Sequence, residues 1–211
     1  MYYFETVEKS TLELLKRLMS DGQLNSFILV GGTALALRLG HRMSVDIDLF
    51  ANTPFNSSQM ANYMRLKYDM KIDFMAENTI KGEINDVAVD ILTHQYPWIE
   101  SPEVINGIRL AGLSDIAAMK LNAISGDGTR LKDFIDISFL SSKLSLTQML
   151  NGYQQKYNSN PVMPLKALVY FNDIDFNVPI KLTGSKEFNW SRIEKRIVEM
   201  ANEPDKVFEP L

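Results

Sequence analysis

Residues 31–50 decide the fold of this chain, and they read Gly-Gly-Thr-Ala-Leu-Ala-Leu-Arg-Leu-Gly-His-Arg-Met-Ser-Val-Asp-Ile-Asp-Leu-Phe. The apolar run just before them, residues 27–30, is typical of a buried strand that leads into the glycine pair. Gly31 and Gly32 let the main chain approach a ligand closely and leave N–H groups free at the start of a helix, which Thr33 can cap. The same residues suit an ordinary helix entry, but such an entry is also an anion site.

A second strand is predicted over residues 45–50, after a turn that contains Arg42 and Ser44. Side chains alternate along a strand, so Asp46 and Asp48 share one face and the apolar residues around them share the other. Neighbouring carboxylates repel each other, and a Mg²⁺ ion that carries a nucleotide's phosphates would remove that repulsion. A phosphate-binding turn beside an acidic pair therefore indicates nucleotidyl transfer. Arg42 either neutralises phosphate charge or pairs with the aspartates.

A third carboxylate is expected from the strand predicted over residues 87–92. Asp90 interrupts this apolar strand, and an ionised carboxylate there is costly without a partner, which a metal shared with the acidic pair would supply. The three carboxylates are then expected to converge. The alternative is a strand-end aspartate in contact with water. Asp73 competes for the role, although its predicted strand, residues 71–77, carries charged residues and is expected to be more exposed.

Lys120 is out of place on the helix predicted over residues 114–125. The polar residues of that helix gather on one side, whereas Lys120 falls among apolar residues on the other. Either its stem lies along the apolar surface with the ammonium in water, or the ammonium reaches a buried negative partner. We predict the second arrangement, with the ammonium pointing into the cleft that holds Asp46 and Asp48, because that acidic group would offset its desolvation.

Asp133 and Asp136 lie three residues apart on the next predicted helix and so occupy neighbouring positions on its surface. Lys132 shares that polar face, and an ordinary solvated helix side would also explain all three residues. One of the two aspartates is expected to be functional, and the residues alone do not distinguish between them. His41 and His94 are interpreted as a turn residue and a strand-end residue rather than as a base or a ligand.

The composition is that of a globular protein without membrane spans. Its 211 residues are 45% hydrophobic and 23% charged, which is ordinary for this class. No apolar run approaches the roughly 20 residues that cross a bilayer, and no signal-peptide pattern opens the chain, so no membrane partner is expected. The lack of cysteine excludes disulfides and thiolate chemistry and agrees with a cytoplasmic location. A net charge of −4 argues against a surface that binds nucleic acid broadly.

The remaining pattern predicts an α/β fold with a small mixed sheet and flanking helices, followed by a helical C-terminal part. The single unit 1–211 would divide into an α/β core of about residues 1–112 and a helical part of about residues 113–211. Further helices are expected over residues 10–19, 57–68, 130–142, 145–156, 162–172 and 190–201, and further strands over 79–84 and 107–110, with a hairpin turn at Asn85 and Asp86. Residues 173–189 are expected to be irregular.

The order of these residues resembles the signature of the nucleotidyltransferase superfamily, in which Gly-Ser precedes an Asp-x-Asp pair. Thr33 stands at the place of the serine, and its hydroxyl can form the same hydrogen bonds. The fuller wording, Gly-Gly-Thr-Ala-Leu-Ala-Leu followed by Arg-x-Ser-x-Asp-Ile-Asp-Leu-Phe, is similar to the AbiEii/AbiGii (MenT-like) family, which supplies toxins of toxin–antitoxin and phage-defence systems. The similarity is close over residues 31–50 and looser over about residues 85–140.

The resemblance implies a nucleotidyltransferase-type α/β fold and an enzyme that moves a nucleoside monophosphate from an NTP to an acceptor. The family also places a lysine in a Met-Lys-Leu segment and carries an Asp-x-x-Asp element downstream, and both have counterparts here. The residues assigned in this way are Asp46, Asp48, Lys120, Asp133 and Asp136 in catalysis, Gly31, Gly32, Thr33, Arg42 and Ser44 in nucleotide binding, and Asp46, Asp48 and Asp90 as ligands of two Mg²⁺ ions.

The same resemblance implies a toxin that modifies tRNA or a protein, with an antitoxin as a further partner. Two alternatives stay open: a nucleotidyltransferase for a small molecule such as an antibiotic, and a non-catalytic nucleotide-binding module. The retained aspartates count against the module. The acidic balance favours a small acceptor over tRNA, whereas the family wording favours tRNA.

Overall fold

A mixed sheet occupies the first half of the chain and carries most of the residues singled out above. The computed structural model describes residues 2–184 and 187–211, and within them one sheet has seven strands in the order β3-β4-β5-β2-β1-β7-β6. The pairs β2–β5 and β1–β7 are parallel and the other pairs are antiparallel. The strands are β1 (Ile28–Leu29), β2 (Ile47–Ala51), β3 (Lys71–Ala76), β4 (Thr79–Ile84), β5 (Val87–Thr93), β6 (Glu103–Ile105) and β7 (Ile108–Leu110).

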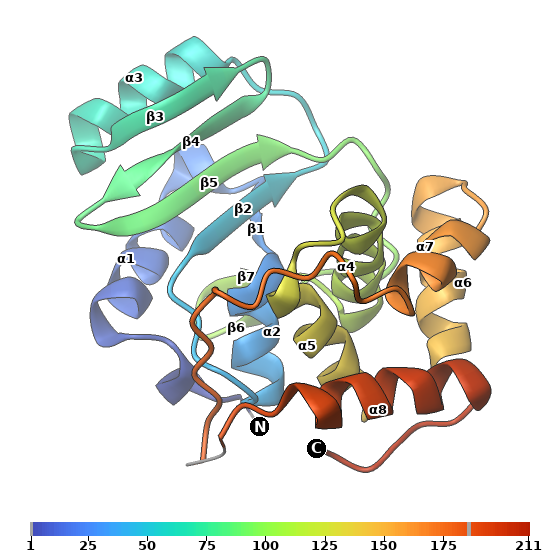
Figure 1. Ribbon diagram of the computed structural model, residues 1–211. Coiled ribbons are helices and arrows are strands. Elements are labelled where there is room, and N and C mark those ends of the chain that lie inside the picture. The colour runs from blue at the N-terminus through green and yellow to red at the C-terminus, as the bar shows by residue number, and fades with distance from the viewer. Residues whose placement is uncertain (1, 185–186) are drawn as a thin grey trace.

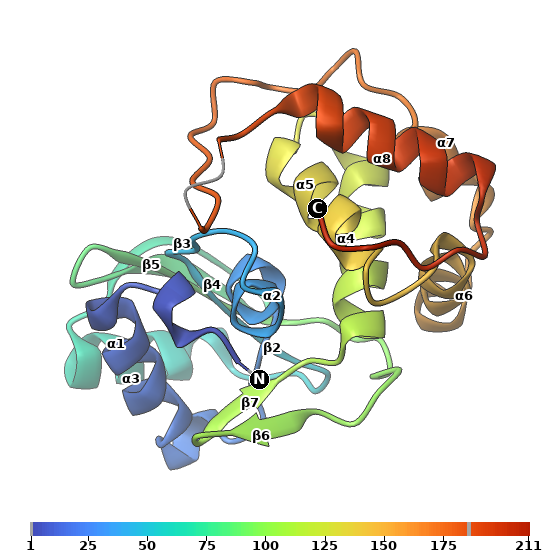
Figure 2. The ribbon, with the colours of Figure 1, turned by 90° about the horizontal axis from the view of Figure 1, so that it is seen from below.

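The helices form two groups, one around the sheet and one beside it (Figure 1, Figure 2). In the first group α1 packs against β7 and α3 against β3 and β4, while α2 contacts β2 and also α4 and α5. In the second group α4 contacts α5, α6 and α7, and α8 packs on α5. The helices are α1 (Lys9–Met19), α2 (Gly31–Leu39), α3 (Ser57–Tyr68), α4 (Leu113–Gly126), α5 (Leu131–Leu140), α6 (Leu146–Tyr157), α7 (Val162–Leu168) and α8 (Trp190–Asn202). No described helix is long and apolar enough to cross a membrane.

The parallel pairing of β2 with β5 sets the register on which the candidate site depends. Asp48 lies directly beside Asp90 in that pairing. Because side chains alternate along β2, Ile47 and Leu49 are buried on one side of the sheet and Asp48 lies on the other. The predicted placement of Asp48 and Asp90 on one face is therefore confirmed.

The β4–β5 hairpin brings β5 back beside the rest of the sheet. Its two turn residues, Asn85 and Asp86, both have left-handed φ values, 50° and 62°. Asparagine and aspartate tolerate this conformation, which matches the twist of the flanking strands. The hairpin predicted at these two residues is confirmed.

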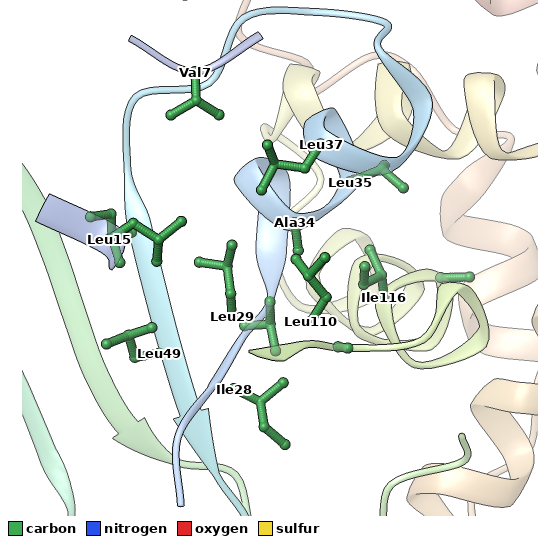
Figure 3. Close-up of a cluster of buried hydrophobic side chains, with 14 of the residues drawn as sticks. Val7, Leu15, Ile28, Leu29, Ala34, Leu35, Leu37, Leu49, Leu110 and Ile116 are labelled. Atoms are coloured by element: carbon green, nitrogen blue, oxygen red, sulfur yellow. The ribbon is translucent and has the colours of Figure 1, made fainter. Parts of the chain in front are cut away.

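One hydrophobic core joins the sheet to both groups of helices. Figure 3 shows Leu15 of α1 near Leu49 of β2, and Leu110 of β7 near Ile116 of α4. These four side chains are at most 1% exposed. Each such burial contributes about 1.5–3 kcal/mol. The predicted core (about residues 1–112) and helical part (about residues 113–211) therefore share one buried cluster.

The start of β2 differs from expectation because its backbone groups bind elsewhere. β2 begins at Ile47 rather than at residue 45, since the main-chain oxygen of Asp46 accepts a hydrogen bond from Thr33 Oγ1 at 2.5 Å. The segment expected to be irregular, residues 173–189, contains no helix or strand among its described residues, which confirms the expectation, and its Lys181 carbonyl accepts a hydrogen bond from the Met43 N–H at 2.8 Å. Residues 185–186 of that segment lie outside the described residues.

A buried ion pair fixes α6 on α4. Lys156 Nζ lies 2.8 Å from Asp115 Oδ1 and 2.9 Å from the Pro97 carbonyl oxygen, and both paired side chains are 0% exposed. The Asp115 carboxylate also accepts hydrogen bonds from the N–H groups of Ile99 and Glu100. One charge pair thus holds together two helices and the loop that follows β5.

Lys156→Met keeps most of the stem volume and leaves the buried Asp115 carboxylate with main-chain donors only. We expect the free energy of unfolding, measured by urea denaturation, to fall by about 3–5 kcal/mol. Lys195→Met removes an exposed pair with Glu199 and should leave stability nearly unchanged. Equal, small effects of the two substitutions would show that the Lys156 pair does not hold the helices together.

Candidate active site

The glycine pair after β1 makes room for two charged side chains. Gly31 has a φ of +68°, in the left-handed region that favours glycine, and a Cβ there would collide with the Asp48 carboxylate. A Cβ on Gly32 would collide with the Arg42 guanidinium. The start of α2 is therefore packed against an acidic and a basic group at once.

The hydroxyl groups of Thr33 and Ser44 fix the loop that leads to Asp46. Thr33 Oγ1 lies 2.9 Å from Ser44 Oγ and 2.5 Å from the main-chain oxygen of Asp46, and both hydroxyl residues are buried. These contacts are internal to the protein. The predicted role of the two hydroxyls in nucleotide binding stays a prediction.

Asp48 and Asp90 form an acidic pair across two parallel strands, and both are half-buried. Burial and the charge of Asp90 together raise the pKa of Asp48 to about 6, against the opposing effect of Lys120. The ionised form of Asp48 is therefore disfavoured here, and a bound cation would favour it.

The carboxylates of Asp46, Asp48 and Asp90 do not converge as predicted. Asp90 pairs with Lys81 of β4, whose Nζ lies 2.5 Å from Oδ2, and Asp46 is exposed just before β2. Across residues 2–184 and 187–211, no three histidine or acidic side chains stand close enough to hold a metal as a group. The counter-ion of Asp90 in this structure is Lys81. The assignment of Asp46, Asp48 and Asp90 as metal ligands stays a prediction.

Lys120 is buried, but its partners are not the aspartates on and before β2. Its Nζ lies 2.5 Å from Asp133 Oδ1 and 2.7 Å from Asp136 Oδ2. The arrangement with the ammonium in water is therefore wrong. Lys120 does line the cleft that holds Asp48, as predicted, but its ion-pair partners are Asp133 and Asp136 rather than Asp46 and Asp48. The correction has a simple cause, since α5 packs directly on α4 and brings two carboxylates within hydrogen-bonding distance.

Asp136 is the centre of a buried charge network. Arg42 donates to it through Nε at 2.7 Å and Nη2 at 2.9 Å, and His41 Nε2 lies 2.7 Å away. Burial opposes ionisation, but Arg42 and Lys120 hold the pKa of Asp136 well below its usual range. Arg42 thus pairs with a distant aspartate rather than with its neighbours in sequence. The solvated helix side is also wrong, because Asp133 and Asp136 are 3% and 0% exposed.

Sequence reasoning missed the surroundings of both histidines. His41 is buried against Asp136, and burial lowers its pKa. His94 Nε2 lies 3.2 Å from the hydroxyl of Tyr157, and burial together with the charge of Lys156 lowers the His94 pKa to about 4. No local pattern could have found these contacts, because the partners are 95 and 63 residues away.

A cleft between the sheet and the helical part collects two kinds of residue. Charged residues form one group, in which Arg130 Nε lies 2.5 Å from Asp133 Oδ2, and aromatic residues form another. Asp133 lines this cleft, whereas Asp136 is fully buried. The cleft lining includes Gly31, Asp48, Phe50 and His94 from the sheet side and Met119, Lys120, Arg130, Asp133 and Tyr157 from the helices.

The raised pKa of Asp48 makes stability depend on pH in a defined direction. The protonated carboxyl contributes stability that is fully present below the unfolded-state pKa and is lost as pH rises through about 6. Asp48→Asn stays neutral, so its free energy of unfolding should exceed that of the wild type by about 1–2 kcal/mol above pH 7 and equal it near pH 4. Urea denaturation without divalent cations checks this. Asp73→Asn, on exposed β3, is the control, and its stability should follow that of the wild type at every pH. If the difference in stability between Asp48→Asn and the wild type does not depend on pH, the raised pKa of Asp48 is contradicted.

Comparisons with known proteins place the sequence of this chain among its relatives. The family model described as "Nucleotidyl transferase AbiEii toxin, Type IV TA system" matches residues 13–67, which include the glycine pair, Asp46 and Asp48. An uncharacterized protein of Aquifex aeolicus (strain VF5) is 34% identical over 174 residues, which cover 79% of this chain and 84% of that one.

Two solved structures from Helicobacter pylori share the fold. The crystal structure of JHP933 has a TM-score of 0.54 at 18% identity and covers 94% of this chain and 93% of its own. A second crystal structure, named for a nucleotidyltransferase, has the same TM-score and identity and covers 94% and 96%. Likenesses at this level of identity concern the fold alone. The family match over residues 13–67 and the Aquifex relative, by contrast, lead to the conclusion that this chain belongs to the AbiEii family of nucleotidyl transferases.

Proposed function

We propose that this enzyme transfers a nucleoside monophosphate from an NTP to an acceptor in a Mg²⁺-dependent reaction, with its centre at Asp48. One observation carries the proposal: Asp48, whose pKa is raised by burial and by neighbouring Asp90, lines a cleft that also contains Lys120 and Arg130. An acceptor oxygen attacks the α-phosphorus and loses its proton to water. The bond from the α-phosphorus to the bridging oxygen breaks, and pyrophosphate leaves.

The donor set fits a magnesium site that the substrate completes. Mg²⁺ is usually bound by one or two carboxylates together with substrate phosphates and water, so a preformed cluster of three protein ligands is not required. Asp48 and Asp90 would hold it, with Asp46 at the exposed end of the same segment. Two such ions would lower the pKa of the attacking group and offset the charge on the leaving pyrophosphate.

The remaining side chains would bind and orient the triphosphate. The N–H groups of Gly31 and Gly32, at the start of the nine-residue helix α2, suit phosphate oxygens. Lys120 and Arg130 would offset the negative charge that develops during transfer. In this scheme Asp133 positions both cations, since it binds each of them.

Asp136 would act one step further from the substrate. It holds Arg42 in place, and Arg42 in turn lies against Gly32 at the start of α2. Thr33 and Ser44 would keep Asp46 at the entrance by their contacts with the loop.

The family description supports a toxin role, which we include in the proposal, with tRNA or a protein as acceptor and an antitoxin as a further partner. Such substrates would be met in the cytoplasm.

The acceptor is identified by incubating the protein with Mg²⁺ and α-labelled NTPs in the presence of total RNA, lysate protein or an aminoglycoside. Label on one of these classes names the acceptor. Parallel reactions with γ-labelled NTPs should give no label on the acceptor, which separates nucleotidyl from phosphoryl transfer.

Asp48→Asn should abolish this transfer and also remove the Mg²⁺-dependent rise in the thermal unfolding midpoint expected for the wild type with an NTP. The shift of the thermal unfolding midpoint reports binding and does not depend on catalytic turnover. Asp73→Asn is the matched control and should retain both properties, because it lies on the exposed strand β3. If Asp48→Asn transfers the nucleotide at the wild-type rate, Asp48 does not bind the catalytic metal.

Lys120→Met tests whether the buried ammonium acts in transfer or only in folding. We expect transfer to fall by at least about 100-fold. Stability should fall as well, because two buried carboxylates lose a partner. The double variant Lys120→Met/Asp133→Asn removes one of those carboxylate charges and should recover part of the stability without recovering transfer. Recovery of both would reduce Lys120 to a structural residue.

A further inference from the structure

The aromatic group in the cleft has no part in the chemistry proposed above. Phe50, His94 and Tyr157 all line the cleft. The ring centroids are 5.8 Å apart for Phe50 and His94 and 5.7 Å apart for His94 and Tyr157. Tyr96 extends the group, 4.7 Å from Tyr157 and 4.8 Å from His94. Rings that line a cleft offer flat π-faces to a ligand.

This aromatic group lies close to the acidic pair, Asp48 and Asp90. Phe50 follows Asp48 by two residues on β2, so both side chains lie on the same side of the strand, about 7 Å apart along it. His94 continues from β5, the strand that carries Asp90. A flat group joined to an α-phosphate through a ribose can therefore reach the rings while the phosphate stays at Asp48.

The aromatic group also lacks the charge that a phosphate would require. Burial and Lys156 lower the pKa of His94 to about 4, so the imidazole is neutral at physiological pH. Helix α4 adds apolar residues to the same cleft, Ile116, Met119 and Ala123. The cations that line the cleft, Lys120 and Arg130, belong to the charged group instead.

We propose that Phe50, His94 and Tyr157 form the base-binding part of the cleft, where the nucleobase of the NTP stacks while its phosphates lie at Asp48 and Lys120. This inference rests on the proposed function, since it names the part of the substrate that the aromatic group recognises. Tyr157 contributes its ring face, and its hydroxyl holds the His94 imidazole in place at 3.2 Å.

The sharpest test compares each NTP with ribose 5′-triphosphate, which has the same sugar and phosphates but no base. Dissociation constants are measured by titration calorimetry with Mg²⁺ and without acceptor. At least one NTP should bind the wild type about tenfold more tightly than ribose 5′-triphosphate. Tyr157→Leu should abolish that difference and leave the affinity for ribose 5′-triphosphate unchanged. Tyr157→Phe, which keeps the ring, should retain it.

Two further variants keep the test interpretable. Tyr170→Leu replaces a half-exposed tyrosine that is not part of the cleft lining and should behave as the wild type. If Tyr157→Leu does not show a cooperative thermal transition, Phe50→Leu provides the same comparison from the strand side.

The inference is overturned if the wild type binds NTPs and ribose 5′-triphosphate equally. It is also overturned if Tyr157→Leu and Phe50→Leu keep the tenfold difference, including the case in which they raise only the KM for the acceptor. Failure of the proposed function is seen separately, as an absence of label transfer by the wild type. A protein that transfers label without base-dependent affinity would retain the proposed function and lose this inference.

Discussion

Two buried carboxylates on α5 hold the sheet and the helical part of this protein in one arrangement. Asp133 and Asp136 are almost completely removed from water, which costs several kcal/mol for each charge unless its partners are well placed. Lys120 comes from α4 and Arg42 from the loop before β2. These partners meet only when α2, α4 and α5 are packed together, so the network forms with the tertiary structure and not before it.

The network also determines the shape of the entrance to β2. Arg42 is held by two hydrogen bonds to Asp136, and it occupies the space that a side chain at position 32 would fill. Glycine is therefore required at position 32 because Arg42 fills this space. Arg42 is held there by Asp136, which lies 94 positions after it in the chain. The loop fixed in this way carries Asp46 on to Asp48.

Asp48 on β2 differs from these carboxylates, because among the residues that the structure describes no ion pair joins it to a cation. In the network every carboxylate has cationic partners at hydrogen-bonding distance, whereas burial beside Asp90 raises the pKa of Asp48. Repulsion of this kind lowers stability, and a bound cation would relieve it. The Lys156–Asp115 pair contributes differently, since it fixes the end of α6 and the loop after β5, from which Tyr157 and His94 reach the cleft.

The sequence by itself determined most of the elements and the sides of the strands, because these depend on backbone periodicity and on local turn chemistry. Strand β6 was not predicted, and α7 ends at Leu168 rather than at residue 172. The alternation around Asp48, the hairpin at Asn85 and Asp86, and the burial of Lys120 on an apolar helix face could all be predicted in this way. Only the tertiary structure decided which charge pairs with which. Lys120 binds Asp133 and Asp136 rather than Asp46 and Asp48, and Asp90 binds Lys81. The physical reason is that an ion pair depends on separations of a few ångströms between groups far apart in the chain, and periodicity carries no information about those separations.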